Sequence, residues 1–199
     1  YGNMRALCEA PQMMLHYANI PYEYKMVWDH YGSSWAEVKK DIIFNRLPIL
    51  IINEDKYIWQ SNTIIRYLSN LTKTKPSDEF QLAYCDAVFE STHEMFSPLN
   101  PTINMTFGEK YNSNKKKLLE DILPNSLNNF EKLLQNSSGN FFIGNDPFYC
   151  DFNAYHHFSM CLILDKNIFS NFPNLKKFIN NFEKLKKIKN YLDGRPELV

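Results

Sequence analysis

The spacing of apolar positions predicts alternating helices and strands in the first third of the chain. In residues 9–19 the apolar side chains recur at the intervals of one helix face, and the pattern ends at Ile20-Pro21. Residues 22–27 (YEYKMV) follow this proline and are rich in strand-forming types, so they predict a strand. Residues 34–40 predict a short helix.

The stretch 45–70 (NRLPILIINEDKYIWQSNTIIRYLSN) has the clearest pattern in the chain. An apolar run is followed by the turn sequence Asn-Glu-Asp-Lys, a second short run and a helical pattern. Two such adjacent runs predict a hairpin of two strands. In the helix that follows, Ile64, Ile65 and Leu68 share one face, and Ser61 stands where an N-cap is expected.

A polar, proline-containing run, 70–80 (NLTKTKPSDEF), indicates a linker, and everything after it has a helical pattern. The order of elements predicts a mixed α/β domain over residues 1–71 followed by an all-α domain over 78–199. The expected helices of the second domain are 78–96, broken by Pro98 and Pro101, then 115–135, one from the Asp146-Pro147 cap to about Leu164, and one from near Pro173 to about Tyr191.

Composition and charge exclude several classes of protein. An apolar fraction of 44% in 199 residues is enough for a buried core. Lys+Arg and Asp+Glu balance at 22 each, so no overall charge favours nucleic acid or an anionic membrane. The longest apolar run, 47–52, is too short to span a bilayer.

The cysteines bear on the cellular compartment. The four cysteines lie far apart, without a Cys-x-x-Cys pair, which indicates reduced thiols. We therefore expect a cytoplasmic protein, and leave open a targeting segment ahead of Tyr1.

A metal site has weak support. His157 and Cys161 share a helix face at i, i+4 spacing, which is half of a ligand set. No second pair accompanies them, so a core role is the better interpretation and no metal is predicted.

Three motifs carry a resemblance to a known family. They are Y-x-N-M-R-x-x-x-E at Tyr1–Glu9, W-x-x-x-K at Trp35–Lys39, and the segment from LPIL to QSNTIIRYL at 47–68. Together they resemble the cytosolic glutathione transferases, most closely the sigma class, which includes the haematopoietic prostaglandin D synthases. The resemblance implies an N-terminal thioredoxin-like domain, whose first strand would precede Tyr1, and an all-helical C-terminal domain.

The resemblance also implies a chemistry. Glutathione reacts through its thiolate, and near neutral pH an unperturbed thiol is mostly protonated. In the family a tyrosine at the position of Tyr1 donates a hydrogen bond to the sulfur, which favours the thiolate. The acceptor would be a hydrophobic electrophile, or an endoperoxide that is isomerised in the prostaglandin synthase variant. Cys8 as a nucleophile fits the motifs less well than Tyr1.

Glutathione-binding residues follow from the same resemblance. The bond before Pro48 is expected to be cis and to turn the Leu47 backbone toward the cysteinyl unit. Ser61, at a helix N-terminus, suits the γ-glutamyl carboxylate. The remaining expected contacts are Gln60 beside Ser61, and Trp35, Lys39 and Arg46 at the glycyl end, with Lys39 paired to its carboxylate.

A second subunit is implied as well. Glu94 lies on an acidic stripe of the first long helix, and in the family an acidic residue at this position reaches the partner's glutathione amine. We therefore expect a homodimer. The alternative interpretation of the stripe is a solvated acidic face.

Two departures from the family pattern bear on function. Leu7 replaces an arginine that in the family helps to hold the thiolate, which favours a second hypothesis: a scaffold or assembly subunit, part of a larger protein complex, with weak or no catalysis. A third hypothesis is a glutathione-binding or hydrophobic-ligand-binding protein without turnover. In the helical domain Phe148 occupies the family's capping position ahead of Asp151, so Asp146-Pro147 is expected to cap the helix instead.

Overall fold

The computed structural model describes residues 5–195, which fall into two compact units. The first unit runs to Lys73 and the second is Thr74–Arg195. The division lies inside the polar stretch 70–80 that indicates a linker.

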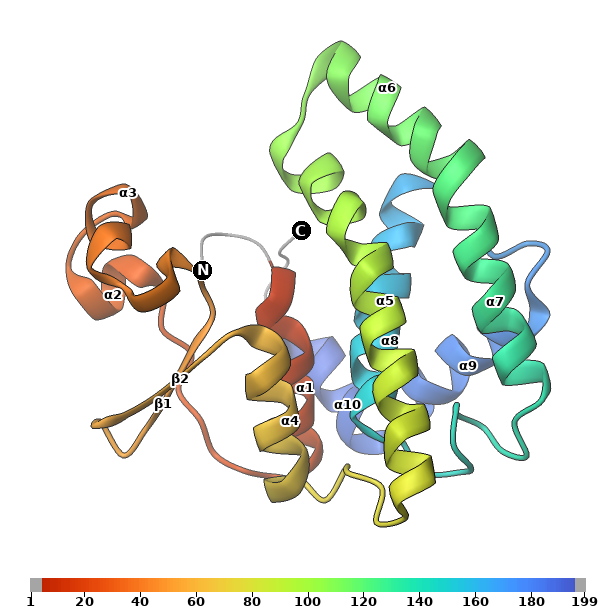
Figure 1. The fold of residues 1–199 in the computed structure, drawn as a ribbon, viewed down its shortest axis with the longest axis horizontal. Coiled ribbons are helices and arrows are strands. Elements are labelled where there is room, and N and C mark those ends of the chain that lie inside the picture. Colours follow the sequence, from red (N-terminus) through yellow and green to blue (C-terminus); the bar gives the residue numbers. More distant parts are fainter. Residues whose placement is uncertain (1–4, 196–199) are drawn as a thin grey trace. The chain divides into compact units, whose positions relative to one another are not determined.

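The first unit combines a two-stranded hairpin with short helices (Figure 1). Single 3-10 turns at Ala6–Cys8, Lys39–Asp41 and Ile43–Asn45 connect some of them. The regular elements are α1 (Glu9–Tyr17), α2 (Val27–Tyr31), α3 (Trp35–Val38), β1 (Ile49–Ile52), β2 (Lys56–Trp59) and α4 (Ser61–Leu71).

The hairpin confirms the prediction from the 45–70 pattern. β1 and β2 pair antiparallel, with Ile49 opposite Trp59 and Ile52 opposite Lys56. Asn53 and Glu54 in the turn both have positive φ, 50° and 68°. The loop between the paired residues Ile52 and Lys56 has three residues, and the two positive φ values let the chain reverse within it.

The α4 helix packs on α1 and on both strands. Its residues Ile64, Ile65 and Leu68 are buried, as their shared face predicts. The expectation that Ser61 is the N-cap was wrong by one residue: Gln60, with φ 69° and ψ 118°, holds that position and Ser61 begins the helix. The strand-to-helix reversal is made at Gln60, which leaves Ser61 inside the first turn.

The strand predicted at 22–27 is not formed. Residues 21–26 are irregular and α2 begins at Val27, where Met26 accepts hydrogen bonds from the Asp29 and His30 amides. Met26 itself is extended, with φ −69° and ψ 157°. Strand-forming types thus produced extended backbone, but no described segment pairs with it to make a strand.

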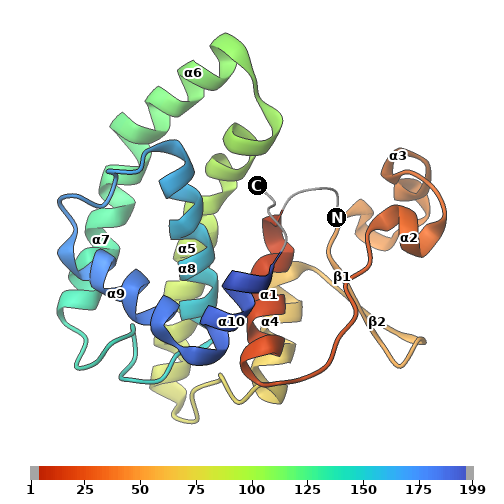
Figure 2. The same cartoon turned by 180° about the vertical axis from the view of Figure 1, so that it is seen from behind.

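The second unit is helical (Figures 1 and 2). In both views α5 and α8 lie side by side. The elements are α5 (Glu79–Met105), α6 (Gly108–Lys117), a π-type segment (Leu118–Ile122), α7 (Leu123–Gln135), α8 (Tyr149–Leu164), α9 (Pro173–Lys184) and α10 (Lys186–Gly194).

Pro98 and Pro101 do not break the first long helix, contrary to the prediction. The carbonyls that lose their amide partners belong to Glu94 and Ser97, whose side chains are both exposed, so water reaches this face of α5. The Thr102 hydroxyl donates to the Pro98 carbonyl at 2.9 Å. Leu99 and Thr102 are buried and hold this part of α5 in the fold.

The helices expected at 115–135 and 173–191 differ in extent from those observed. The former begins at Gly108 and widens into the π-type segment before α7. The latter is divided at Leu185, whose ψ of 115° is not helical, into α9 and α10.

The cap predicted at Asp146-Pro147 was also wrong, because α8 begins at Tyr149 and is capped by Asp151. The buried Asp151 carboxylate accepts hydrogen bonds from the Phe148 amide at 2.8 Å and from the Phe142 amide at 3.1 Å. The second bond reaches nine residues back along the chain and ties the preceding loop to the helix start.

The core of the second unit surrounds α8, whose residues 149–158 are all buried. Aromatic rings in edge-to-face contact supply much of it, for example Phe130 against Phe158 with ring centroids 5.5 Å apart. Within residues 5–195, no helix is long and apolar enough to cross a membrane.

Candidate functional site

The site predicted in the first unit centres on the start of β1. The Leu47–Pro48 peptide is cis, as expected. Because Ile49 pairs with Trp59, this peptide lies opposite the residues that follow β2, which are Gln60 and Ser61. The hairpin register therefore sets Leu47 and Pro48 at the same end of the hairpin as Gln60 and Ser61.

The N-terminus of α4 supplies hydrogen-bond donors at this place. The Ile64 amide is the first to bond within the helix, donating to the Gln60 carbonyl at 2.9 Å. The amides that precede Ile64 belong to the first turn, where N–H groups point out of the helix end. Together with the helix dipole, they form a place where a carboxylate is stabilised.

Ser61 contributes a hydroxyl to the same helix end. The residue is buried, and its Oγ lies 3.4 Å from Asn62 Oδ1. This bond is long, so the hydroxyl can exchange it for a bond to a carboxylate.

Trp35 and Lys39 stand on the neighbouring α3 and the turn after it. A capping box fixes the start of α3: the Ser34 amide and hydroxyl donate to Glu37 Oε2 at 2.9 and 2.8 Å. The amide bond in particular holds the pKa of the Glu37 carboxyl below its ordinary value. Trp35 is half-buried and Lys39 is exposed.

The structure does not join these two residues to the hairpin end. Among residues 5–195, no hydrogen bond, ion pair or ring contact links Trp35 or Lys39 with Gln60 or Ser61. The Lys39 ammonium forms no ion pair with any described carboxylate, so it is available to an anionic ligand.

Arg46 follows an irregular turn that the sequence pattern did not predict. Phe44 and Asn45 have positive φ, 65° and 50°, and Arg46 returns to extended backbone just before the cis peptide. The Phe44 ring meets the Trp59 ring edge to face, with centroids 6.2 Å apart. This contact fixes the turn beside the hairpin end and leaves the Arg46 side chain exposed.

Three further residues that the sequence analysis singled out belong to other segments of the chain. Tyr1 lies outside the described residues. Glu94 is an exposed residue of α5 in the second unit. Leu7 is half-buried in the 3-10 turn that precedes α1.

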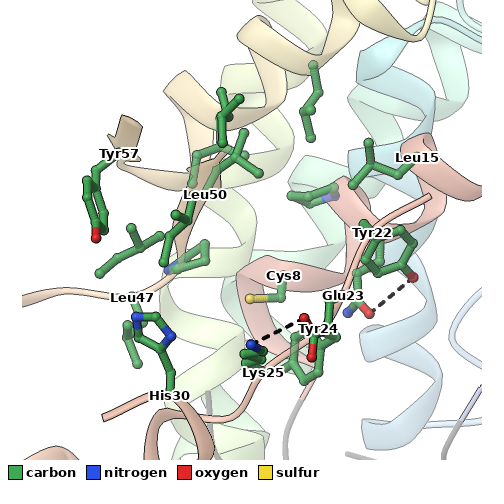
Figure 3. A pocket seen from close by; sticks show the side chains of 18 of the residues that line it. Cys8, Leu15, Tyr22, Glu23, Tyr24, Lys25, His30, Leu47, Leu50 and Tyr57 are labelled. Atoms are coloured by element: carbon green, nitrogen blue, oxygen red, sulfur yellow. Dashed lines mark hydrogen bonds and ion pairs between the residues drawn. The ribbon is translucent and has the colours of Figure 1, made fainter. Parts of the chain in front are cut away.

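A cavity of about 820 Å³ occupies another part of the first unit (Figure 3). Its lining comes from α1, the irregular segment before α2, β1 and α4, and includes Leu15 and Leu50. It takes in Leu47 and Pro48 but not Trp35, Lys39, Arg46, Gln60 or Ser61. The cavity therefore does not coincide with the predicted glutathione site.

Cys8 lines this cavity and is not an activated thiol. Burial raises its pKa to about 12, against a smaller opposing effect of its hydrogen bond to Tyr24. A thiol with such a pKa stays protonated near neutrality, which argues against Cys8 as a nucleophile. All four cysteines are buried and free.

His157 and Cys161 are both core residues of α8. In the part of the chain from 5 to 195, no group of three His, Cys, Asp or Glu side chains could hold a metal ion.

Two family models match the chain, one over each part. Residues 1–70 match the N-terminal domain of glutathione S-transferase, and residues 93–195 match its C-terminal domain.

Relatives with curated names span nearly all of the chain. It is 30% identical to human "Glutathione S-transferase Mu 3", over 98% of this chain and 86% of the relative's length. It is 27% identical to "Glutathione S-transferase P" of Caenorhabditis elegans, over 98% of this chain and 91% of that protein.

Solved structures share the fold. The Pi-class glutathione S-transferase of Onchocerca volvulus superposes with a TM-score of 0.86 at 25% identity, covering 98% of this chain and 91% of the other. Rat hPGDS complexed with a quinoline superposes with a TM-score of 0.87 at 24% identity, covering 99% and 96%. At such identities this second likeness concerns the fold alone.

Proposed function

Because the chain belongs to the glutathione S-transferase family, we propose that it transfers the thiolate of glutathione to a hydrophobic electrophile, in the manner of the sigma class. Family membership supports glutathione transfer as the general activity. The observation that carries the site is the hairpin register, which sets the cis Leu47–Pro48 peptide opposite Gln60 and Ser61.

Each part of glutathione has a matching group in the proposed site. The extended tripeptide lies along the start of β1, where the Leu47 main chain bonds the cysteinyl unit. Its γ-glutamyl carboxylate meets the N-terminal end of α4 and the Ser61 hydroxyl, with Gln60 as a neutral neighbour. The glycyl carboxylate pairs with Lys39, and Trp35 and Arg46 flank it.

Tyr1 is proposed to activate the thiol. Its hydroxyl would donate a hydrogen bond to the sulfur and so favour the thiolate over the thiol. A hydrogen bond to a charged acceptor is worth about 1.5–3 kcal/mol, which corresponds to a fall of about one to two units in the pKa of the bound thiol.

Binding and activation can be tested separately. The purified protein is first applied to immobilised glutathione, and the bound thiol is then titrated by its thiolate absorbance. We expect a thiol pKa below that of free glutathione in the wild type and a value close to free glutathione in Tyr1→Phe. A wild-type value equal to that of free glutathione would overturn the proposed catalysis, and failure to bind would overturn the site.

Leu7 favours a second candidate function. A leucine cannot stabilise a thiolate, so the fold would serve as a scaffold or assembly subunit with reduced catalysis. The variant Leu7→Arg separates the two. A large gain in transferase activity without a change in glutathione affinity supports the scaffold function for the natural chain, whereas an already active wild type argues against it.

We propose further that the protein is a cytoplasmic homodimer in which Glu94 reaches the partner's glutathione amine. Ile43 and Phe44 support a dimer, because 53% and 59% of these side chains are exposed and a second copy would bury them. Light scattering on the purified protein tests the dimer. If the protein is a dimer, Glu94→Gln is expected to weaken glutathione binding about tenfold, and a monomer would remove Glu94 from the site.

A further inference from the structure

Three imidazole rings gather around one phenylalanine between α5 and α8. The Phe96 ring stacks on His157 with centroids 4.2 Å apart and an interplanar angle of 18°. The rings of His156 and His93 lie 5.6 and 6.4 Å from the same phenylalanine. His156 and His157 are buried, so the cluster belongs to the core of the helical unit.

The hydrogen bonds of His157 define its tautomer. Its Nδ1 lies 2.9 Å from the Thr92 carbonyl oxygen, which only accepts, so Nδ1 carries the proton. Asn153 Nδ2 is 3.5 Å from the same nitrogen but donates instead to Thr92 Oγ1 at 2.9 Å. The unprotonated nitrogen is therefore Nε2, which is buried and has no hydrogen-bond partner within residues 5–195.

A second proton on this ring would enter an unfavourable environment. It would place an N–H group and a positive charge at Nε2, where the structure offers no acceptor. The Phe96 face attracts a cation, but this attraction does not replace the hydration that the charge loses. Burial, with smaller effects of His156 and His93, accordingly holds the pKa of His157 well below its ordinary value.

The charged and titratable groups on the neighbouring elements do not offset the cost of a positive charge at His157. From α5 the facing group is His93, whose ring centroid lies 6.2 Å from that of His157 and whose effect also lowers the pKa of His157. From α9 the Glu183 carboxylate accepts the Tyr155 hydroxyl at 3.0 Å, on another face of α8. Along α8 itself, His156 adjoins the ring.

One turn along α8, Cys161 is a neutral thiol, because burial raises its pKa to about 12. It therefore offers no negative charge to a protonated His157.

We propose that this imidazole cluster makes the packing of α5 against α8 sensitive to acid, and that a proton entering at His157 Nε2 separates the two helices. The direction of the pH dependence follows from the protonation of His157 in the folded and the unfolded protein. Folding keeps His157 neutral, whereas the unfolded ring binds a proton below about pH 6.5. As the pH falls below this value, His157 alone lowers the folding equilibrium constant, by at most about tenfold per pH unit.

Asp151, also on α8, opposes the effect of His157 on stability. Burial raises the pKa of its carboxyl to about 7, so the folded state holds a proton that the unfolded state releases above about pH 4. This contribution opposes that of His157 between about pH 4 and 6.5.

The test compares the wild type with His157→Phe, which keeps an aromatic ring against Phe96 but binds no proton. Urea unfolding is followed by far-UV circular dichroism from about pH 7.5 to 4.5. The ratio of the variant's folding constant to that of the wild type should rise as the pH falls below about 6.5, by at most about tenfold per pH unit. The same ratio for His30→Gln, an exposed residue of α2, serves as the baseline.

A ratio for His157→Phe that does not change with pH would overturn the proposal. A second measurement needs no variant: the 15N shifts of the imidazoles in the folded wild type report the protonation of each nitrogen. We expect His157 to remain the neutral Nδ1–H tautomer at about pH 5.5. A doubly protonated His157 in the folded protein at that pH would equally overturn it.

Discussion

Asp151→Ala is predicted to destabilise the helical unit severely. The carboxylate is fully buried and accepts the amides of Phe142 and Phe148 at 3.1 and 2.8 Å. Alanine leaves both amides without an acceptor, and one unsatisfied buried group costs about 1–3 kcal/mol. The expected loss is therefore about 2–6 kcal/mol, a large part of the roughly 5–15 kcal/mol that stabilises an ordinary domain.

The matched control is Asp146→Ala, five residues earlier. Asp146 is the cap that the sequence pattern favours, but it is exposed and forms none of these bonds. Its replacement should change the free energy of unfolding by less than about 0.5 kcal/mol. Urea unfolding of both variants at constant pH, followed by circular dichroism, makes the comparison. If Asp146→Ala is the more costly change, the assignment of the cap to Asp151 is refuted.

Two further predictions concern the glutathione site and α5. Ser61→Ala should weaken binding to glutathione about tenfold or more, because it removes a hydrogen bond to a carboxylate. Thr63→Ala, on the exposed side of α4, should leave the affinity measured by calorimetry unchanged. Equal losses of affinity in both variants would argue against a contact between Ser61 and glutathione. Pro101→Ala should raise the free energy of unfolding by about 2 kcal/mol, because alanine restores an amide partner for the Ser97 carbonyl within the helix. A fall in the midpoint of thermal unfolding would contradict the conclusion that Pro101 costs α5 a hydrogen bond.

The elements that the sequence predicted correctly are those determined by neighbouring residues. The hairpin and α4 follow from two apolar runs, a four-residue turn and a helical face, all within residues 45–70. The prediction of a strand at residues 22–27 was wrong because a strand needs a pairing partner, and residue types alone do not supply one. The prediction that the prolines end the first long helix was wrong because the carbonyls that lose their amide partners lie on an exposed face of α5.

The geometry around the predicted site was predictable only where it is local. The position of Pro48 at the hairpin end from which Gln60 continues is a consequence of hairpin register, which the turn determines locally. The second bond of Asp151 depends instead on a loop amide at Phe142, and the core position of His157 on packing between two helices. Such long-range partners cannot be identified from the spacing of one segment.

Two titratable groups on α8 lead to a last prediction about pH. Asp151, with its pKa raised to about 7, stabilises the folded state increasingly as the pH falls from about 7 to 4, and this stability is lost as the pH rises through about 7. His157, with its pKa lowered by burial, destabilises the folded state increasingly as the pH falls below about 6.5. Each slope is about 1.4 kcal/mol per pH unit, so the two nearly cancel in the wild type between about pH 4 and 6.5.

Removing one group should reveal the slope of the other. Relative to the wild type, His157→Phe should gain stability as the pH falls, by about 1.4 kcal/mol per unit, and Asp151→Asn should lose it at the same rate. Unfolding free energies of the three proteins, measured in the same buffers from about pH 6.5 to 4.5, test this directly. Parallel curves would mean that neither group changes its protonation on unfolding in this range. Slopes of opposite sign would show that one buried helix carries two opposing proton equilibria, and that the stability of the helical unit in acid depends on their balance.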